Sequence, residues 1–321
     1  MKKLFWIVPL CLILLVVIGF FAIPLTESVS RIAVPGSDGW MAALPDDTPL
    51  SDIVIPGTHD SATAHVQLAY FSKCQALGIA DQLAAGYRYL DIRLGTDDKT
   101  AGFKLMHGFT NCKTGVFGGA LGLEAVLSDC YAFLSAHPTE TVLFAAKYEH
   151  GDLPVPEVQA RLAAEIAKNP DRWLLTDALP SLGEARGKLV LLRRWADEAG
   201  LGSGSGISFL WTDQGGRDDP SLAAAEEPQP GYTLFVQDRF KYDTEEKWAA
   251  FTAGLNAPAG EDGVVLSFLS TSGSAAYGHP YRYAKALNPR LAALDDGALR
   301  GWIIVDFASA VLAEKIYGAN F

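Results

Sequence analysis

Short apolar runs with β-strand character alternate along this chain with segments of helical spacing, and this alternation limits the possible folds more than any other feature. The runs occupy residues 52–55, 87–93, 103–106, 141–146, 188–192, 233–236, 263–268 and 301–305. Helical spacing recurs between them at 78–87, 122–138, 156–170 and 243–255. Strands that alternate with helices predict a parallel sheet covered on both faces. Eight strands in about 260 residues predict an α/β fold of the (β/α)8 TIM-barrel type, irregular in the glycine- and aspartate-rich stretch 195–232.

Ionisable residues follow most of these strands at the point where each strand ends. They are His59 and Asp60, Asp91 and Arg93, His107, Lys147, Arg194, Asp238, and Asp306. Each one alone could be a turn cap, an ion-pair partner or a solvated strand end. A barrel, however, gathers the carboxyl ends of its strands around one mouth, where enzymes of this fold keep their chemistry. The pattern therefore predicts a single active-site cleft.

The residue types at these strand ends indicate acid–base chemistry on an anion. Two histidines suit a general base and a general acid, and neighbouring carboxylates would fix their tautomers and raise their basicity. Arg93, Lys147 and Arg194 would form a cationic patch suited to a tetrahedral anion such as a phosphodiester. Because arginine supplies the positive charge, we expect no metal and no cofactor. The GxSxG motif of a serine nucleophile does not occur in the sequence.

The N-terminus carries an uncharged apolar run, residues 4–25, after Lys2 and Lys3. This length is sufficient to span a bilayer, and the lysines favour a cytoplasmic N-terminus. We therefore expect an N-terminal hydrophobic helix over 1–30 that acts as a signal anchor, a linker over 31–50, and an extracytoplasmic catalytic domain over 51–321. The alternative is a cleaved signal peptide and a secreted body, because "SVS" at 28–30 offers small residues for a peptidase.

The acidic balance of the chain limits its partners. A net charge of −11 and a pI near 5.0 argue against nucleic acid, whose phosphates require a basic surface. The same charge disfavours electrostatic adsorption to anionic lipid. Membrane contact by the body should therefore be apolar and local, and we expect the body to be a monomer.

Four cysteines are present: Cys11 in the apolar run, and Cys74, Cys112 and Cys130 in the body. They form no CxxC pair or cysteine–histidine cluster typical of zinc sites. Cys130 lies on the apolar face of a predicted helix. We therefore expect Cys74 and Cys112, in loops near the mouth, to form a disulfide, with three free thiols in the body as the alternative.

An ordered set of motifs gives a specific resemblance. "IPGTHDS", "QLAAGYRYLDIRL", "LMHG", "FLSAHPTETVLFAAKYE", "GKLVLLRR", "VQDRFKYDTEEK" and "GWIIVDF" cover residues 50–310 approximately and resemble the bacterial phosphatidylinositol-specific phospholipase C family (X domain). The resemblance implies an irregular (β/α)8 barrel. It also implies metal-independent cleavage of phosphatidylinositol by attack of the inositol 2-hydroxyl, which gives diacylglycerol and inositol 1,2-cyclic phosphate.

The resemblance also implies roles for individual residues. His59 would be the base, oriented by Asp306, and His107 the acid, assisted by Asp60. Arg93, beside Asp91, would stabilise the phosphorane-like charge. An arginine at this position matches the metal-independent branch, whereas calcium-dependent relatives carry a carboxylate there. The residues that fall where the family binds the inositol head group are Lys147, Arg194 and Asp238.

Two departures from the family pattern bear on the head group. Phe240 replaces a tyrosine two positions beyond Asp238, and the aromatic rim is reduced to Tyr277, Tyr281 and Tyr283. Phe240 and Tyr277 remain candidates for substrate contact. We expect phosphatidylinositol or a related lipid as partner, with membrane contact through the N-terminal segment and the barrel rim.

Two other functions stay open at the level of sequence. A metal-dependent glycerophosphodiester phosphodiesterase shares the barrel and the histidine pair, but it needs metal-binding carboxylates after its early strands, and Arg93 in "LDIR" argues against that. A membrane-tethered barrel could also bind lipid or glycan without turnover.

Overall fold

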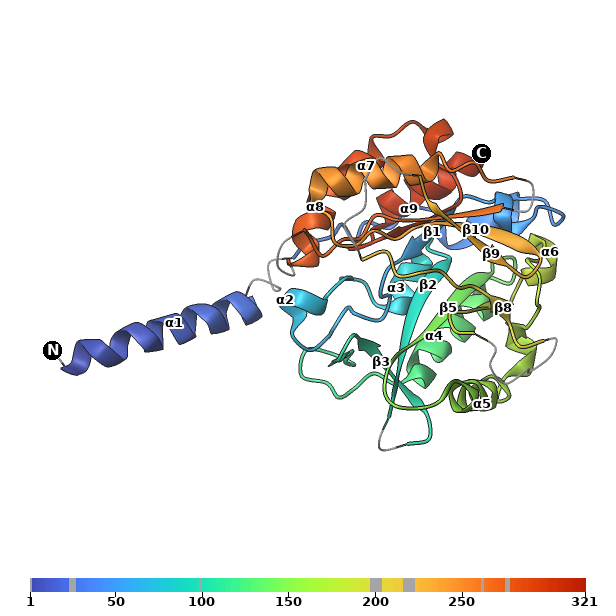
Figure 1. The fold of residues 1–321 in the computed structure, drawn as a ribbon. Helices are drawn as coiled ribbons and strands as arrows, with labels where there is room; N and C mark the ends of the chain where they lie inside the picture. The colour runs from blue at the N-terminus through green and yellow to red at the C-terminus, as the bar shows by residue number, and fades with distance from the viewer. Residues whose placement is uncertain are drawn as a thin grey trace.

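Eight parallel strands form the centre of the molecule in a computed structural model that describes residues 2–22, 27–97, 100–196, 204–215, 223–260, 263–274 and 278–321 (Figure 1). Adjacent strands follow the order β8-β7-β5-β2-β1-β12-β11-β10. Their bounds are β1 Ile55–Thr58, β2 Tyr89–Thr96, β5 Val142–His150, β7 Leu189–Arg193, β8 Ile207–Ser208, β10 Tyr232–Gln237, β11 Gly263–Phe268 and β12 Trp302–Val305. The predicted irregular (β/α)8 barrel is confirmed.

The barrel has a seam where the sequence predicted irregularity. Within the described ranges no backbone ladder joins β8 to β10, and β9 (Ala225–Gln229) pairs antiparallel with β10 instead. Side chains bridge the gap. Gln229 accepts hydrogen bonds from the amide of Leu210 at 3.1 Å and the hydroxyl of Ser208 at 3.2 Å, and the hydroxyl of Tyr232 donates to the carbonyl of Ser208.

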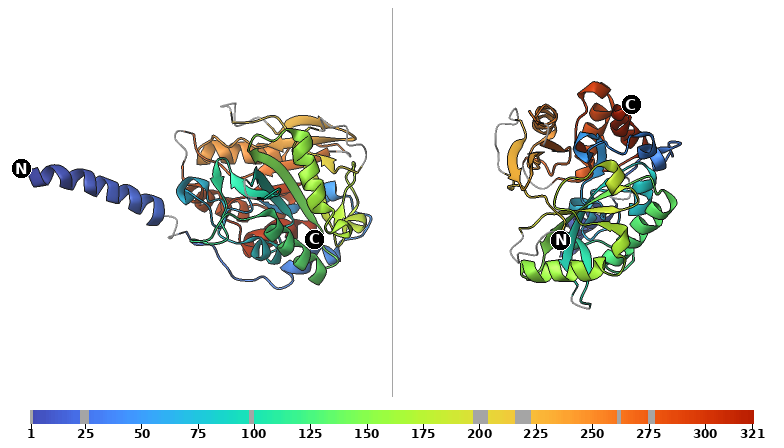
Figure 2. Two further views of the ribbon diagram at one scale, coloured as in Figure 1. Left: turned by 90° about the horizontal axis from the view of Figure 1, so that it is seen from below. Right: turned by 90° about the vertical axis from the view of Figure 1, so that its right-hand side faces the viewer.

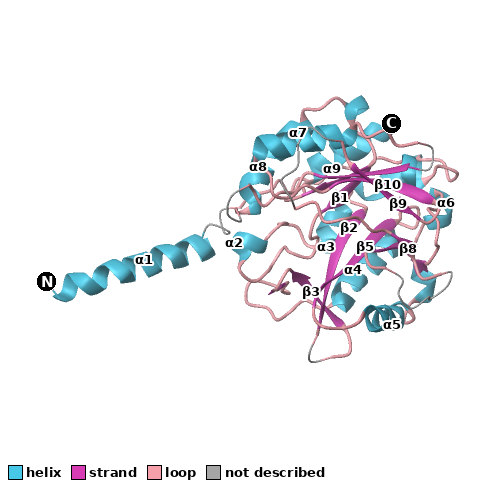
Figure 3. Cartoon of the chain, viewed as in Figure 1, coloured by secondary structure: helices cyan, strands magenta, loops and turns pink. Residues whose placement is uncertain are grey.

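Helices surround the strands, as Figure 3 shows by colour. Those of the first half of the chain and those of the C-terminal half lie on opposite sides of the sheet (Figures 1 and 2). The four predicted helices are confirmed as α3 Ile79–Ala84, α4 Leu123–Ala136, α5 Val155–Ile166 and α7 Thr244–Leu255. The other helical elements and one short strand are α2 Ala69–Ser72, α6 Leu182–Ala185, α8 Pro280–Ala292, α9 Ala310–Tyr317, the 3-10 turns η2 Ser37–Ala43, η3 Leu50–Asp52, η4 Pro170–Arg172, η5 Asp296–Ala298 and η6 Gly318–Asn320, and β6 Trp173–Leu174.

Two strand predictions need correction. The first strand is 55–58 rather than 52–55, because Asp52 donates its amide to Pro49 in η3 and the ladder to β12 begins at Ile55. The run 103–106 forms β3 (Phe103–His107), which pairs antiparallel with β2 and with β4 (Thr110–Asn111). This hairpin lies outside the barrel wall, and the eighth wall strand is the two-residue β8, too short to give a periodic signal.

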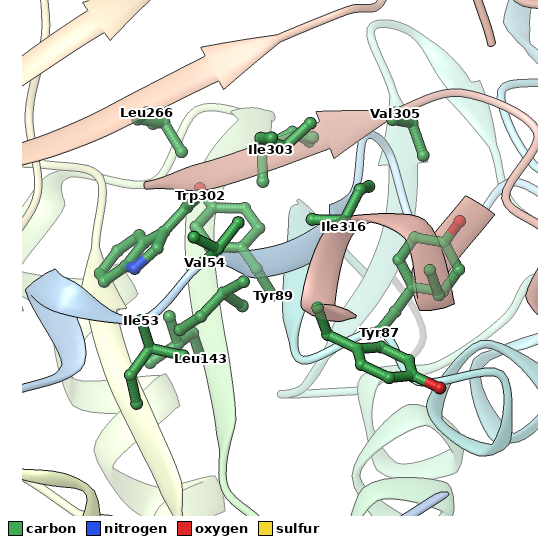
Figure 4. Packing of buried hydrophobic residues seen from close by; sticks show 14 of the residues in the cluster. Ile53, Val54, Tyr87, Tyr89, Leu143, Leu266, Trp302, Ile303, Val305 and Ile316 are labelled. Atoms are coloured by element: carbon green, nitrogen blue, oxygen red, sulfur yellow. The ribbon is translucent and has the colours of Figure 1, made fainter. Parts of the chain in front are cut away.

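Part of the expected linker belongs to the packed body. In η2, Trp40 stacks on Tyr317 of α9 with ring centroids 5.1 Å apart, and Met41 is fully buried. The barrel interior holds large apolar side chains, including Trp302 and Tyr89, which lie together under β12 in Figure 4. Burial of this apolar surface is the main favourable contribution to folding.

The N-terminal helix α1 (Lys2–Ala22) extends from the body near α2 (Figure 1). Within the described residues, no helix is both long enough and apolar enough to cross a membrane. The expected span at 4–25 therefore remains a prediction without support from the structure.

Candidate active site

The carboxyl ends of the strands bring most of the predicted site residues together around Arg93. Its side chain leaves β2 and is largely buried, and it contacts carboxylates of β2 itself, of β5 and of the turn after β1. Nη2 donates to Asp91 at 3.1 Å, Nη1 donates to Glu149 at 3.1 Å, and Nε lies 3.4 Å from Asp60. These carboxylates raise the pKa of Arg93 further although burial opposes this, so the guanidinium is a permanent cation.

His59 follows β1 and is held from both sides of its ring. Nδ1 lies 2.8 Å from Oδ1 of Asp306, and Nε2 lies 2.9 Å from Nη2 of Arg93. Because arginine can only donate, Nε2 is an acceptor and Nδ1–H donates to Asp306. Burial alone would lower the pKa of His59, but the charge and hydrogen bond of Asp306 and the charge of Asp60 raise it. This tautomer, with an unprotonated Nε2 that accepts from Arg93, is the one a general base requires.

His107, at the end of β3, belongs to the same cluster through Asp60. Its Nδ1 lies 3.1 Å from Oδ2 of Asp60 and 3.0 Å from the carbonyl oxygen of Ser72 on α2. The two imidazoles lie with ring centroids 6.3 Å apart, nearly perpendicular. Both imidazoles therefore approach Asp60, the carboxylate that also lies near Arg93.

Asp60 has an uncommon backbone conformation. Its φ is 44°, in the left-handed region that non-glycine residues seldom adopt, and its amide donates to Asp91 at 3.1 Å. The side chain is almost fully buried, and burial raises its pKa against the opposing effect of Arg93 and His107. A strained turn that places a carboxylate between two histidines is typical of functional sites.

A second group of residues forms one wall of the cleft. Arg194 donates to Asp91 at 2.9 Å, and its guanidinium lies 3.7 Å from the ring centroid of Trp211. Trp211 donates through Nε1 to Asp238 at 3.1 Å. Sequence analysis missed Trp211, which lies in the irregular stretch 195–232, where no periodic pattern marks it as a site residue.

Lys147 extends from β5, the strand next to β2, where it pairs in register with Arg93. Its Nζ lies 2.6 Å from Oε2 of Glu149, which lies near the end of the same strand but was given no role in the sequence analysis. Burial alone would raise the pKa of Glu149, but Arg93 and Lys147 hold it well below its usual range. Asp91 is held low in the same way by Arg93 and Arg194 against the effect of burial.

The remaining head-group candidates are less closely joined to the cluster. Phe240 is partly buried, its ring lies where a Cβ at Gly215 would meet it, and Nζ of Lys241 lies 5.7 Å from the ring centroid. Tyr277 lies outside the described residues.

The expected disulfide between Cys74 and Cys112 is wrong in this structure, where all four cysteines are free. Cys74 lies at the active site, with Sγ 3.7 Å from Nδ1 of His107, and its side chain is buried. Cys112 instead packs among apolar side chains of the cluster under α4 that also holds Cys130. The two loops run near the same mouth, but their side chains point into different environments.

The fold and the site define a class: an α/β-barrel enzyme that pairs two histidines, each with a carboxylate, around a buried arginine. Comparison with known proteins makes this specific, because residues 47–195 match the family model "Phosphatidylinositol-specific phospholipase C, X domain". Over these residues the chain is similar to this family, as its motifs indicated.

Curated relatives support the assignment. The chain is 29% identical over 331 residues to a 1-phosphatidylinositol phosphodiesterase of Staphylococcus aureus strain NCTC 8325, covering 96% of this chain and 94% of that protein. A protein of the same name from Listeria monocytogenes is 29% identical over 164 residues, which are 48% of this chain and 47% of that protein.

Solved structures agree on the fold. A mutant phosphatidylinositol-specific phospholipase C from S. aureus superimposes with a TM-score of 0.74 at 26% identity, covering 89% of this chain and 98% of that one. Another structure of the S. aureus enzyme, with a TM-score of 0.73 at 25% identity over 89% of this chain and 98% of that one, concerns the modulation of its membrane binding. The L. monocytogenes enzyme shares the fold with a TM-score of 0.66 at 22% identity, covering 89% of this chain and 99% of that one.

Proposed function

We propose that this protein cleaves phosphatidylinositol by attack of the inositol 2-hydroxyl on phosphorus, which releases diacylglycerol and inositol 1,2-cyclic phosphate. The observation that carries the proposal is the orientation of His59, whose Nδ1–H is committed to Asp306 while Nε2 faces the buried cation Arg93. A base of fixed tautomer beside a fixed cation suits deprotonation of a hydroxyl next to a phosphate.

The proposed reaction assigns each proton to an atom. Nε2 of His59 takes the proton of the 2-hydroxyl, and the 2-oxygen forms a bond to phosphorus. The bond from phosphorus to the diacylglycerol oxygen breaks, and His107 gives that oxygen a proton while Asp60 stabilises the charged imidazole. Arg93 moves its Nη2 donor from His59 to a phosphate oxygen and neutralises the charge that develops there.

The wall formed by Arg194, Trp211 and Asp238 is the proposed inositol site, together with Lys147 of β5. The charged donors and carboxylates of this site already bond to one another and are therefore already ordered. They can bind the hydroxyls of a sugar ring in place of these bonds with little further loss of side-chain entropy. Phe240 and Tyr277 are the proposed aromatic contacts at the edge of this site.

Membrane contact is proposed at the rim beside the second histidine. Large apolar side chains are exposed there, among them Phe109, which is 74% exposed, and Phe117, which is 99% exposed. Because the body is acidic, we expect it to bind a lipid surface by inserting these apolar side chains rather than by charge attraction. We propose that the segment 1–30 directs the barrel domain, residues 51–321, outside the cytoplasm as a monomer, either anchored by 4–25 or secreted after cleavage.

The test is an assay of the purified chain with labelled phosphatidylinositol, with and without chelator, in which phosphorus NMR identifies the product. Inositol 1,2-cyclic phosphate formed equally with and without chelator is the expected result. Activity abolished by chelation would instead indicate a metal-dependent glycerophosphodiester phosphodiesterase. Binding to phosphatidylinositol vesicles without turnover would indicate a non-catalytic lipid-binding barrel.

A further inference from the structure

Cys74 lies against both proposed catalytic pairs, although the reaction gives it no role. Its Sγ is 3.7 Å from Nδ1 of His107, and Nδ1 is 3.1 Å from Oδ2 of Asp60. Nε2 of His59 lies 3.6 Å from the same Oδ2. Sulfur, oxygen and two nitrogens, the usual ligands of zinc, therefore surround one small space.

The separations of these atoms match a tetrahedral metal site. Zinc bonds of about 2.0 Å to nitrogen or oxygen and 2.3 Å to sulfur require ligand atoms about 3.3–3.6 Å apart. Nδ1 of His107 lies 3.1 Å from Oδ2 of Asp60 and 3.7 Å from Sγ of Cys74, and Nε2 of His59 lies 3.6 Å from the same Oδ2. The ligand atoms of His59, Asp60 and Cys74 all lie within 4.8 Å of one another.

A second observation points to a ligand at this position. Asp60 is 2% exposed, and its Oδ2 accepts no well-directed hydrogen bond within the described part of the chain, although it lies near both histidines. A buried carboxylate oxygen left in this state is costly unless a cation approaches it.

We propose that Asp60, Cys74 and His107 form a binding site for a soft divalent cation, with Zn²⁺ as the best fit, and that occupation of this site reversibly inhibits the enzyme. The inhibition rests on the proposed function, whereas the binding does not. The fourth coordination position of the metal faces Nε2 of His59. This nitrogen can bind the metal only if its hydrogen bond from Arg93 is broken.

The protons of this step are accounted for. The thiol of Cys74 releases its proton to solvent as the S–Zn bond forms. His107 binds through Nδ1 as the Nε2–H tautomer and gives up its contact with the carbonyl of Ser72. No redox partner is required. The metal removes Asp60 from His107 and competes with the phosphate for the space in front of Arg93, and for both reasons turnover stops.

The local charge favours occupation in spite of Arg93. The charged side chains joined by direct contacts around it carry more negative than positive charge: Asp60, Asp91, Glu149 and, through His59, Asp306, against Arg93, Arg194 and Lys147. A Zn²⁺–thiolate unit adds one positive charge and balances this cluster. The metal is thus an inhibitor of an active site that already has its own cation, not a cofactor.

The experiment uses the full chain after removal of metals with EDTA and dialysis. Co²⁺ replaces Zn²⁺ as a spectroscopic probe, because thiolate coordination gives an intense near-ultraviolet charge-transfer band. We expect the band to saturate at one Co²⁺ per chain and to disappear when Zn²⁺ is added. Cys74→Ala should lose the band, whereas Cys130→Ala, which removes a buried thiol within α4, should keep it.

The same variants are then assayed on phosphatidylinositol during a Zn²⁺ titration. Cys74→Ala should keep near-parental activity without metal and should need at least about 10-fold more Zn²⁺ for half inhibition. Cys130→Ala should be inhibited by Zn²⁺ like the parent protein. Cys74→Ser provides a second variant if the alanine form does not fold. No cobalt band in the parent, or a band that survives in Cys74→Ala, overturns the proposal. A parent that shows the band but cleaves no lipid overturns the function alone.

Discussion

Nδ1 of His59 lies 2.8 Å from Oδ1 of Asp306, although 247 positions separate the two residues in the chain. The parallel ladder between β1 and β12 brings them together, because Thr58 pairs with Val305 and each functional residue follows its strand by one position. The orientation of the proposed base therefore depends on the closure of the first and last wall strands of the barrel.

His59→Ala and His107→Ala should each abolish most turnover of phosphatidylinositol, by about 10²–10⁴-fold, because each removes a positioned proton-transfer group. The measurement is kcat/KM on labelled lipid, with circular dichroism to show that the fold is retained. His137→Ala, which removes a histidine just beyond α4 and away from the cluster, serves as control. Near-parental activity in either active-site variant would refute the acid–base pair.

Arg93→Lys should lower kcat by about 10²–10³-fold, since a single ammonium cannot keep contact with Asp91 and Glu149 and also meet a phosphate oxygen. Arg93→Asp should lose the remaining metal-independent activity because the charge is reversed. Arg161→Lys on the exposed face of α5 should have no effect. The arginine role would be wrong if Arg93→Lys retained full activity with unchanged KM.

The activity should fall on the acid side at a pH above that expected for an ordinary histidine. Burial alone would lower the pKa of His59, but the charge and hydrogen bond of Asp306 together with the charge of Asp60 raise it above 6.5, and the base must be neutral to act. Lowering the pH through this raised pKa protonates His59 and stops the reaction. In Asp306→Asn the raising charge is lost, so the acid limb of the kcat/KM profile should move to lower pH while the plateau falls. An acid limb that does not move would exclude His59 as the titrating base.

Glu140→Ala should destabilise the fold by about 3–5 kcal/mol, because it leaves Arg88 as an uncompensated buried charge. Both side chains are fully buried, and Nη2 of Arg88 lies 2.8 Å from Glu140. Glu157→Ala breaks a helical pair on the surface with Arg161 and should cost about 0–1 kcal/mol. Urea unfolding measures both values, and equal losses would contradict this account of the buried pair.

Reaction of the denatured, unreduced chain with a thiol reagent should detect all four cysteines. Burial raises the pKa of the Cys74 and Cys112 thiols, so both should react slowly in the folded protein and fast after unfolding. A count of two free thiols, with Cys74 and Cys112 linked on peptide mapping, would contradict this prediction and show that the disulfide forms.

The sequence by itself determined the barrel and most of the site residues, because both leave periodic or positional signals. Apolar runs have the period of buried strands, and the ionisable residues that end them, such as Arg93 and Asp306, must meet at one mouth once the strands are parallel. The proposed roles of the two histidines also followed from these positions and from the family motifs.

Tertiary structure decided what depends on contacts between distant segments. Only the folded chain shows that Trp211 stacks on Arg194, since the stretch that carries it has no periodicity. The run 103–106 reads as a wall strand, yet its antiparallel pairing with β2 makes it a hairpin that presents His107. The direction of a side chain is likewise invisible in sequence: Cys74 and Cys112 lie in neighbouring loops, but one thiol faces a histidine and the other the apolar core. Strand period and residue type are local properties, whereas pairing partners and side-chain directions are fixed only when the whole barrel packs.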